Sequence, residues 1–411
     1  MMNSGDTAWV LTASALVLLM TIPGLAFFYG GLVRRKNVLS ILMQCFVIVC
    51  VVSLQWMLFG YSLAFGPDFH GIIGKLDWMG LAGVGSLPNP DYSKGIPHYA
   101  FMIFQAMFAI ITPALIIGAY AERVKFSAFL VFTLLWTTFV YDPLAHWVWG
   151  VGGWMRNLGA LDFAGGIVVH VSSGISALVL ALLLGKRIGY NHQPIRPHNL
   201  PFTVLGAALL WFGWFGFNAG SALAADGLAA NAFVTTHIAT AAAGLTWALV
   251  EWWHNGTPTI LGAATGAVAG LVAVTPACGF VNPMNAMFIG MIVAVVCYIA
   301  VAIMKGKFGY DDSLDAFGVH GVGGTVGTFA TGLFAEKVVN AAGADGLLFG
   351  NAHQLYVQSL SLIVTVAFAA IMTFIIFKIV DALIGMRVEE NNEVVGLDLT
   401  QQSEAAYTVI E

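Results

Sequence analysis

Two histidines, His170 and His320, are the residues best placed to do chemistry, because each lies in a long apolar stretch without another ionisable side chain. Their surroundings read GGIVVHVSSGISALVLALLL and FGVHGVGGTVGTFATGLF. Ionisable groups at membrane depth cost free energy, so they usually face a pathway or a partner. A neutral imidazole offers one hydrogen-bond donor and one acceptor, and two of them can line a polar path or pass a proton.

An acid precedes each histidine. Asp162 stands eight residues before His170 in DFAGGIVVH, and Asp315 stands five before His320 in DAFGVH. A near-repeat of one signature in two halves of a membrane chain predicts a pore built from two related parts. Asp162 is expected near the outer mouth, where it caps a helix, attracts a cation, or does both. Asp315 and the two other acids of DDSLD are expected to be solvated charges in a cytoplasmic loop.

Other chemistry is less well supported by the sequence. A metal site needs three or four ligands in reach, and no further Cys, His or Glu cluster has suitable spacing, so neither metal nor cofactor is expected. Aromatic residues gather at 104–109, at Trp149 and at 211–217. Most membrane aromatics pack or mark the interface. A minority form cation–π sites, worth up to about 2 kcal/mol when desolvated.

The composition belongs in a bilayer. Of 411 residues, 59% are hydrophobic and 9% charged, whereas about a quarter of a soluble domain is charged. The net charge of -5 gives no signal for nucleic-acid binding. A span needs about 20 mostly apolar residues. That rule predicts eleven spans, at 7–31, 38–65, 98–120, 126–147, 164–185, 201–221, 232–253, 259–276, 284–304, 318–335 and 355–385.

The positive charges fix an orientation on this map. Twelve of the 16 lysines and arginines fall on one side of the predicted membrane. The four on the other side are Lys75, Lys94, Arg156 and Lys337. Positive residues are enriched on the cytoplasmic side, so the N-terminus is predicted outside and the C-terminus inside. The spans then divide into two five-helix repeats, inverted in the membrane, plus a last helix.

Several longer strings resemble the ammonium transporter family, the Amt/Mep/Rh superfamily, on its bacterial Amt side. They span residues 23 to 407 in one order, so together they are far more specific than any one alone. The strings are PGLAFFYGGLVRRKN, FQAMFA, GAYAERVKF, HWVWG, DFAGGIVVH, WFGWFGFNAGS, TPACG, DDSLDAFGVHGVGG, GLDL and EAAY.

The resemblance implies roles at matching positions. Trp149, Phe108 and Ser221 match the family's outer cation-recruitment site, and Phe108 and Phe217 match two stacked rings that gate the pore. His170 and His320 match twin histidines that line a narrow apolar channel. The remaining match is Asp162, an acid near the recruitment site that the family needs for function or structure.

The resemblance also implies an assembly. It predicts a homotrimer in the inner (plasma) membrane, with surrounding lipid, one pore per subunit, and ammonium, ammonia and methylammonium as substrates. It further predicts a PII-type signalling protein at the cytoplasmic face. The transmembrane domain is expected at 1–385, with repeat one at about 7–185, repeat two at about 201–335 and the last helix at 355–385. The regulatory tail is 386–411, either a flexible end or a docking segment.

Energetics favour ammonia as the travelling species. Burying an unpaired ion in hydrocarbon costs tens of kcal/mol in idealised estimates, and cation–π contacts return about 2. Deprotonating an amine of pKa near 10 at pH 7 costs only about 4 kcal/mol. Potassium has no proton to lose, so the same pore would reject it.

Three rival functions remain to be compared. Neutral Rh-like gas channels tend to have an extra N-terminal span and to lack the aromatic at Trp149. Ammonium sensors with little flux usually carry a fused signalling domain, and 26 residues follow Gly385 here, which favours transport. A membrane enzyme would need a nucleophile signature or a third metal ligand, so no enzyme is expected.

Overall fold

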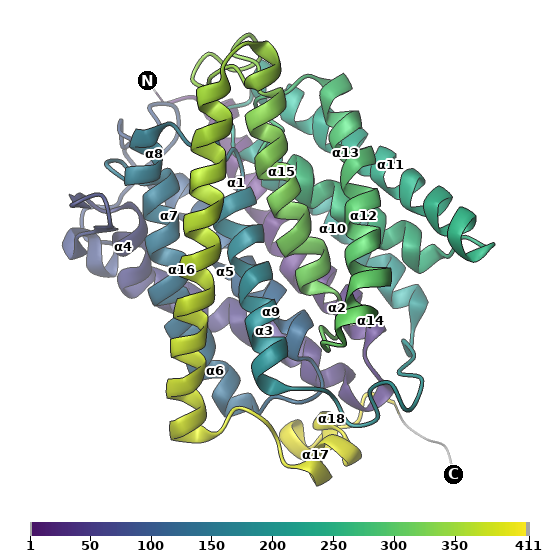
Figure 1. Cartoon of the computed structure of the whole chain (residues 1–411). Helices are drawn as coiled ribbons and strands as arrows, with labels where there is room; N and C mark the ends of the chain where they lie inside the picture. The colour runs from purple at the N-terminus through teal and green to yellow at the C-terminus, as the bar shows by residue number, and fades with distance from the viewer. Residues whose placement is uncertain (1, 408–411) are drawn as a thin grey trace.

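A computed structural model describes residues 2–407, and the fold is almost entirely helical. Figure 1 shows the long helices running roughly side by side, with the N-terminus near one end and α17 and α18 at the other. Following the predicted orientation, we call the end that carries α17 and α18 the inner end and the opposite end the outer end. The prediction of an all-helical membrane protein is confirmed.

The first half of the bundle contains five continuous helical runs. The label η marks short π-helical turns within or at the start of several runs (η1, η3 and η5 to η8) and short 3₁₀ helices (η2, η4 and η9). The first run is α1 (Ser4–Leu19), η1 (Met20–Leu25) and α2 (Ala26–Leu32), and the second is η2 (Arg35–Asn37), α3 (Val38–Gln55), η3 (Trp56–Gly60) and α4 (Tyr61–Phe65). The outer-end pieces β1 (Asp68–Phe69), β2 (Ile73–Gly74) and η4 (Leu76–Leu81) lead to the third run, α5 (His98–Tyr120). The fourth run is α6 (Phe126–Trp136), η5 (Thr137–Tyr141), α7 (Asp142–Trp149) and α8 (Trp154–Leu158), and the fifth is η6 (Gly166–Val171) and α9 (Ser172–Leu184).

The second half continues the bundle and ends in the tail. Its elements are α10 (Leu200–Gly220), α11 (Gly227–Asn255), α12 (Ile260–Val274), α13 (Pro283–Tyr298) with η7 (Ile299–Met304) and α14 (Lys305–Phe308), η8 (Phe317–Gly321) with α15 (Val322–Phe334), η9 (Leu347–Phe349), α16 (Ala352–Ile384), α17 (Glu390–Val395) and α18 (Leu397–Gln402). β1 and β2 form a small antiparallel pair.

All eleven predicted spans fall on these helices, but helix length does not establish eleven crossings. Within residues 2–407, nine helical runs are long and apolar enough to cross a membrane. α12 is apolar but has only 15 residues. The run formed by η8 and α15 is not among the nine, and its sequence is rich in glycine and threonine, which lowers its hydropathy.

Short polar side chains start many of the helices. An asparagine followed closely by a proline begins both α10, at Asn199, and α13, at Asn282. The asparagine oxygen accepts a hydrogen bond from a free N–H of the first turn, and the proline needs no partner there. Asp226 caps α11 with its side chain as well, accepting from the N–H groups of Leu228 and Ala229, but no proline follows it. The loops between apolar runs therefore carry the signals that end one helix and start the next.

Glycines let the two histidine-bearing runs cross at close range. A Cβ added to Gly174 on α9 would lie 2.0 Å from the nitrogen of Gly321 on η8. A Cβ at Gly324 on α15 would lie 3.0 Å from the nitrogen of Val171 on η6. Each glycine stands four residues after its own histidine and packs on the residue that follows the other histidine. The crossing is thus reciprocal, and it brings the middles of both runs together.

A buried network of charges closes the inner end. Arg187 donates to Asp311 from Nη2 at 2.8 Å and from Nε at 2.9 Å, and its Nη1 lies 3.3 Å from Glu122 Oε2. Arg34 also pairs with Glu122, at 2.8 Å. The expectation of solvated charges is wrong for Asp311 and Asp312, which are each 1% exposed. Both carboxylates can be buried because each has hydrogen-bond donors nearby. Arg187 donates to Asp311, and backbone N–H groups at the start of a helix donate to Asp312.

The described part of the tail is docked on the loops of the inner end. Lys36 Nζ donates to the carbonyl of Glu393 at 2.9 Å, and the N–H of Leu397 donates to Asn37 Oδ1 at 2.8 Å. The Glu393 carboxylate is 1% exposed and accepts from the N–H of Ile188 at 2.6 Å. The tail was expected to be either a flexible end or a docking segment, and up to residue 407 it is docked on the protein's own loops. Residues 408–411 lie outside the described residues.

We predict that Asp311→Asn destabilises the protein by about 3–5 kcal/mol, because the buried Arg187 loses the closer of its two acidic partners and keeps only the longer contact to Glu122. Burial alone would raise the pKa of Asp311, but the hydrogen bonds and charge of Arg187 outweigh it and hold that pKa below its usual value. The lowered pKa means that this stability is present above about pH 4 and is lost as the pH falls further. Thermal unfolding in detergent measures the difference at pH 7, and measurements from pH 5 down to about pH 2 follow its loss.

Asp91→Asn is the matched control, because Asp91 is exposed on an outer loop. It should change stability by less than about 0.5 kcal/mol. Equal melting temperatures for the two variants at pH 7 would contradict a structural role for the buried pair.

Candidate functional site

His170 and His320 meet at the centre of the bundle. Their Nδ1 atoms are 3.3 Å apart, and their rings stack with centroids 5.3 Å apart and planes 17° from parallel. His170 is 1% exposed and His320 is 4% exposed. An Nδ1-to-Nδ1 contact at this distance requires that one nitrogen carries the proton and the other accepts it. The pair can therefore share a proton without movement of either ring.

The space beside the histidines is narrow and apolar. Trp214 stacks on His170, with centroids 5.4 Å apart, and its Nε1 donates to Thr275 Oγ1 at 2.9 Å. A cavity of about 10 Å³ is lined by both histidines and otherwise by apolar side chains, among them Phe217. That volume admits about one molecule of the size of water. His170 Nε2 has no partner among the described residues, so it is free to bind such a molecule.

Asp162 positions His170 through the backbone. Its Oδ1 accepts from the N–H groups of Gly165 and Gly166, and its Oδ2 accepts from those of Ile167 and Val168, at 2.6 to 3.1 Å. These are the free N–H groups at the start of the helix that carries His170. The capping role predicted for Asp162 is therefore what the structure contains, and both carboxylate oxygens are occupied by it.

Asp312, which the sequence analysis passed over, does the same for His320. Its carboxylate accepts from the N–H groups of Ala316 at 3.1 Å and Phe317 at 2.8 Å. Burial, followed by the nearby Asp315 charge, raises the pKa of Asp312 to about 7. Asp312 stands eight residues before His320, the same spacing as Asp162 to His170. This shared eight-residue spacing is the feature of the sequence that could have identified Asp312 as the capping acid.

Asp315 was the wrong counterpart for Asp162. It has a positive φ of 61° and pairs with Lys305 instead of capping the helix.

Two phenyl rings close the site on its outer side. The centroids of Phe108, on α5, and Phe217, on α10, are 4.3 Å apart with planes at 32°. Phe108 is 1% exposed and Phe217 is 0% exposed. Phe108 lines the pocket on the outer side of this ring pair, and Phe217 lines the narrow cavity on its inner side.

An aromatic pocket of about 210 Å³ lies outside the ring pair. Its lining residues are Phe65, Tyr92, Phe101, Gln105, Phe108, Val148, Trp149, Arg156, Phe163, Ser221 and Leu223. Three predicted recruitment residues, Trp149, Phe108 and Ser221, are thus brought together here. The ring of Trp149 meets that of Phe108 edge-on at 5.8 Å. Asp162 does not line the pocket, but its carbonyl accepts from Trp149 Nε1 at 2.9 Å.

Two lining residues escaped the sequence analysis. Gln105 stands three residues before Phe108, about one helical turn away, so the spacing could have placed both on one face. Its Oε1 is buried and has no partner among the described residues. Arg156, on the short helix α8, was noted only as an outward-facing charge, because no sequence rule places a side chain from between two predicted spans beside a pocket.

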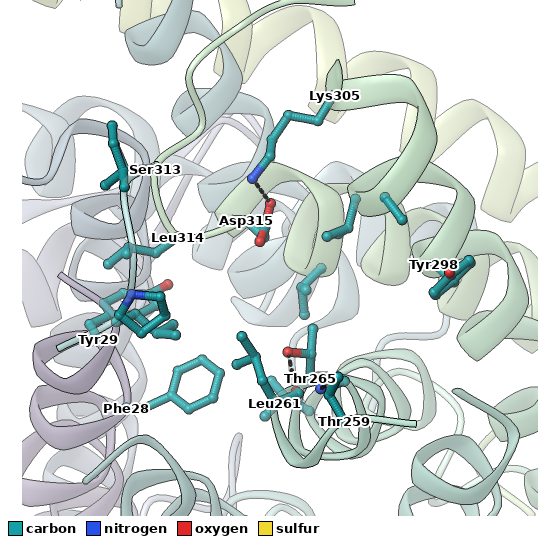
Figure 2. A pocket seen from close by; sticks show the side chains of 18 of the residues that line it. Phe28, Tyr29, Thr259, Leu261, Thr265, Tyr298, Lys305, Ser313, Leu314 and Asp315 are labelled. Atoms are coloured by element: carbon teal, nitrogen blue, oxygen red, sulfur yellow. Dashed lines mark hydrogen bonds and ion pairs between the residues drawn. The ribbon is translucent and has the colours of Figure 1, made fainter. Parts of the chain in front are cut away.

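A larger vestibule of about 650 Å³ opens at the inner end and reaches His320. Figure 2 shows Phe28 and Tyr29 on one side of it, and Lys305 and Asp315 joined across its far wall. His320 lines both this vestibule and the narrow cavity. From outside to inside, the order is aromatic pocket, phenyl rings, narrow cavity with the histidines, and vestibule.

This order suits a path. In the described part of the chain, no group of three or more His, Cys, Asp or Glu side chains could hold a metal ion. The polar atoms of the narrow part are those of the two imidazoles, which can bind or deprotonate a small neutral or cationic solute.

Comparison with known proteins gives one consistent match. The Ammonium Transporter Family profile matches residues 8–407. An ammonium transporter of Bacillus subtilis is 55% identical over 406 residues, covering 99% of both chains. The crystal structure of Candida albicans Mep2 is similar with a TM-score of 0.89 and 38% identity, over 95% of this chain and 88% of that one. A structure named Sensor Amt Protein has a TM-score of 0.88 and 30% identity, over 97% and 98%.

We predict that Asp162→Ala destabilises the protein by at least about 3 kcal/mol, because four buried N–H groups lose their acceptor and each costs about 1–3. Asp226→Ala is the matched control. Asp226 caps α11 at the surface through two N–H groups, so its loss should cost about 1 kcal/mol. The melting temperatures of both variants in detergent provide the comparison. If Asp162→Ala melts like Asp226→Ala, the capping account is wrong.

Proposed function

This chain belongs to the ammonium transporter family, and we propose that it recruits ammonium at the outer pocket, deprotonates it near the phenyl rings and conducts ammonia past the twin histidines. One observation carries the proposal. Phe108 lines the aromatic pocket and contacts Phe217, which lines the narrow cavity with both histidines, and His320 lines that cavity and the inner vestibule alike.

The outer pocket has the chemistry of a weak cation site. Aromatic faces attract a desolvated cation by up to about 2 kcal/mol. The Ser221 hydroxyl donates to the carbonyl of Phe217 at 2.8 Å, so its lone pairs remain available to accept from ammonium. Gln105 Oε1 adds a second acceptor without a partner in the described residues. Ammonium has four N–H donors, and potassium has none to offer these acceptors.

The narrow cavity then selects the neutral form. Moving an intact cation into it would cost far more than the roughly 4 kcal/mol needed to deprotonate ammonium at pH 7. Ammonia can donate to an imidazole nitrogen and accept from an imidazole N–H. The two Nδ1 atoms, 3.3 Å apart, also give the released proton a possible route. We therefore assign His170 and His320 to the conducting path and the phenyl rings to its gate.

The wider assignments follow from the family. We propose eleven membrane crossings as two inverted repeats plus a last helix, with the N-terminus outside and the tail in the cytoplasm. The matching caps at Asp162 and Asp312 and the reciprocal crossing at Gly174 and Gly324 support the repeats.

We further propose a homotrimer in the plasma membrane and control by a PII-type protein at the inner end. The apolar side of α10 and α11 supports an oligomer, since Phe212 and Phe233 are exposed there and Phe233 stacks on the half-buried Phe215 with centroids 3.9 Å apart. The docked tail and the open vestibule support inner-end control, because a partner bound there would cover the exit of the path.

We predict that His170→Ala and His320→Ala each lower methylammonium uptake at least tenfold, because the narrow cavity then lacks one of its two polar partners. Uptake into proteoliposomes of the purified protein measures this. His237→Ala is the control, since His237 is exposed and stacks on Trp211 away from the cavity. Variants with full flux and unchanged ammonium selectivity would remove the histidines from the mechanism.

A further inference from the structure

The outer pocket contains one charged side chain, and its charge has the same sign as ammonium. Of the described residues that line this pocket, Arg156 alone is charged, and the others are aromatic, aliphatic or neutral polar. A cation site would ordinarily exclude a guanidinium, which remains protonated in proteins. The presence of Arg156 therefore calls for a functional account.

Arg156 is held at the pocket rim by a specific contact. Its Nη1 donates to the carbonyl of Trp149 at 2.7 Å. That carbonyl belongs to the last residue of α7, where the helix dipole favours a positive group. The guanidinium is thus fixed beside the backbone of the main recruitment aromatic, although the side chain itself is exposed.

Among the described residues, no acid forms an ion pair with Arg156. The exposed Asp91 acts on Tyr92 with the opposite sign, but it makes no direct contact of this kind with the guanidinium. The acid closest in sequence, Asp162, has both oxygens engaged by backbone N–H groups.

The charge also acts on a neighbour in the pocket wall. Burial raises the pKa of Tyr92 to about 12 and the charge of Asp91 adds to this, whereas a hydrogen bond from Val151 and the charge of Arg156 lower it. Arg156 is therefore close enough to influence a charge inside the pocket.

We propose that Arg156 sets the ammonium affinity of the outer pocket by electrostatic repulsion, an inference that rests on the proposed function. A fixed positive charge at the rim raises the ammonium concentration at which the pocket fills. It acts on every monovalent cation and not on neutral ammonia. The aromatic rings and acceptors then hold ammonium loosely enough for it to move on to the phenyl rings.

The charge series Arg156→Lys, Arg156→Gln and Arg156→Glu tests this proposal. The readout is the KM for methylammonium uptake into proteoliposomes. Arg156→Gln should lower KM about two- to fourfold, as expected for an exposed unit charge roughly 10 Å away at an effective dielectric constant of about 40–80, and Arg156→Glu should lower it further by a similar factor. Arg156→Lys should keep the KM of the unaltered protein, because the charge remains.

Two further measurements separate charge from position. The KM ratio of the unaltered protein to Arg156→Gln should approach one as ionic strength rises from about 0.02 M to about 0.5 M, because salt screens the exposed charge. Lys337→Gln removes the same charge from an exposed outer loop away from the pocket and should leave KM unchanged.

Several results would overturn the proposal. If Arg156→Lys and Arg156→Gln shift KM alike, the hydrogen bond to Trp149 matters and the charge does not. An unchanged or raised KM in Arg156→Gln and Arg156→Glu contradicts repulsion directly. If the unaltered protein itself takes up no methylammonium, the proposed function fails, and this inference fails with it.

Discussion

Removing water from an ion costs more free energy than an apolar channel can return, and the architecture around the twin histidines depends on this constraint. The narrow cavity has room for about one small molecule and is lined by apolar side chains apart from two imidazoles. Polar groups are more frequent on either side of it, in the outer pocket and the inner vestibule. In the proposed function, a solute that can leave its charge outside passes where a permanent ion does not.

The same constraint governs the protein's own polar groups. Helix ends near the cavity would leave N–H groups without water, and a buried carboxylate supplies the acceptors in each half. Asp162 serves the run that carries His170, and Asp312 serves the run that carries His320. Glycines at the crossing then let the two runs approach closely enough for the imidazoles to meet at 3.3 Å. The position of each histidine thus depends on atoms well outside the cavity.

Features marked by a strong local sequence pattern could be predicted from the sequence. The apolar runs mark the helices, the histidines stand out within them, and Asp162 precedes its helix in the position of a cap. Asp312 was missed because a nearer acid, Asp315, looked like the counterpart, although only Asp312 shares the eight-residue spacing. The burial of Asp311 depends on Arg187, which is 124 positions away, and the docking of Glu393 depends on loops far earlier in the chain. Such pairings arise from tertiary packing, so local sequence patterns do not contain them.

The central claim is that the path selects a solute able to give up its proton. Competition during methylammonium uptake into proteoliposomes tests it most directly, with ammonium and potassium added separately at equal concentration. The account predicts that excess ammonium abolishes uptake, whereas potassium, which is similar in size but has no proton to lose, leaves it nearly unchanged. Potassium that blocks uptake as strongly as ammonium would contradict the account.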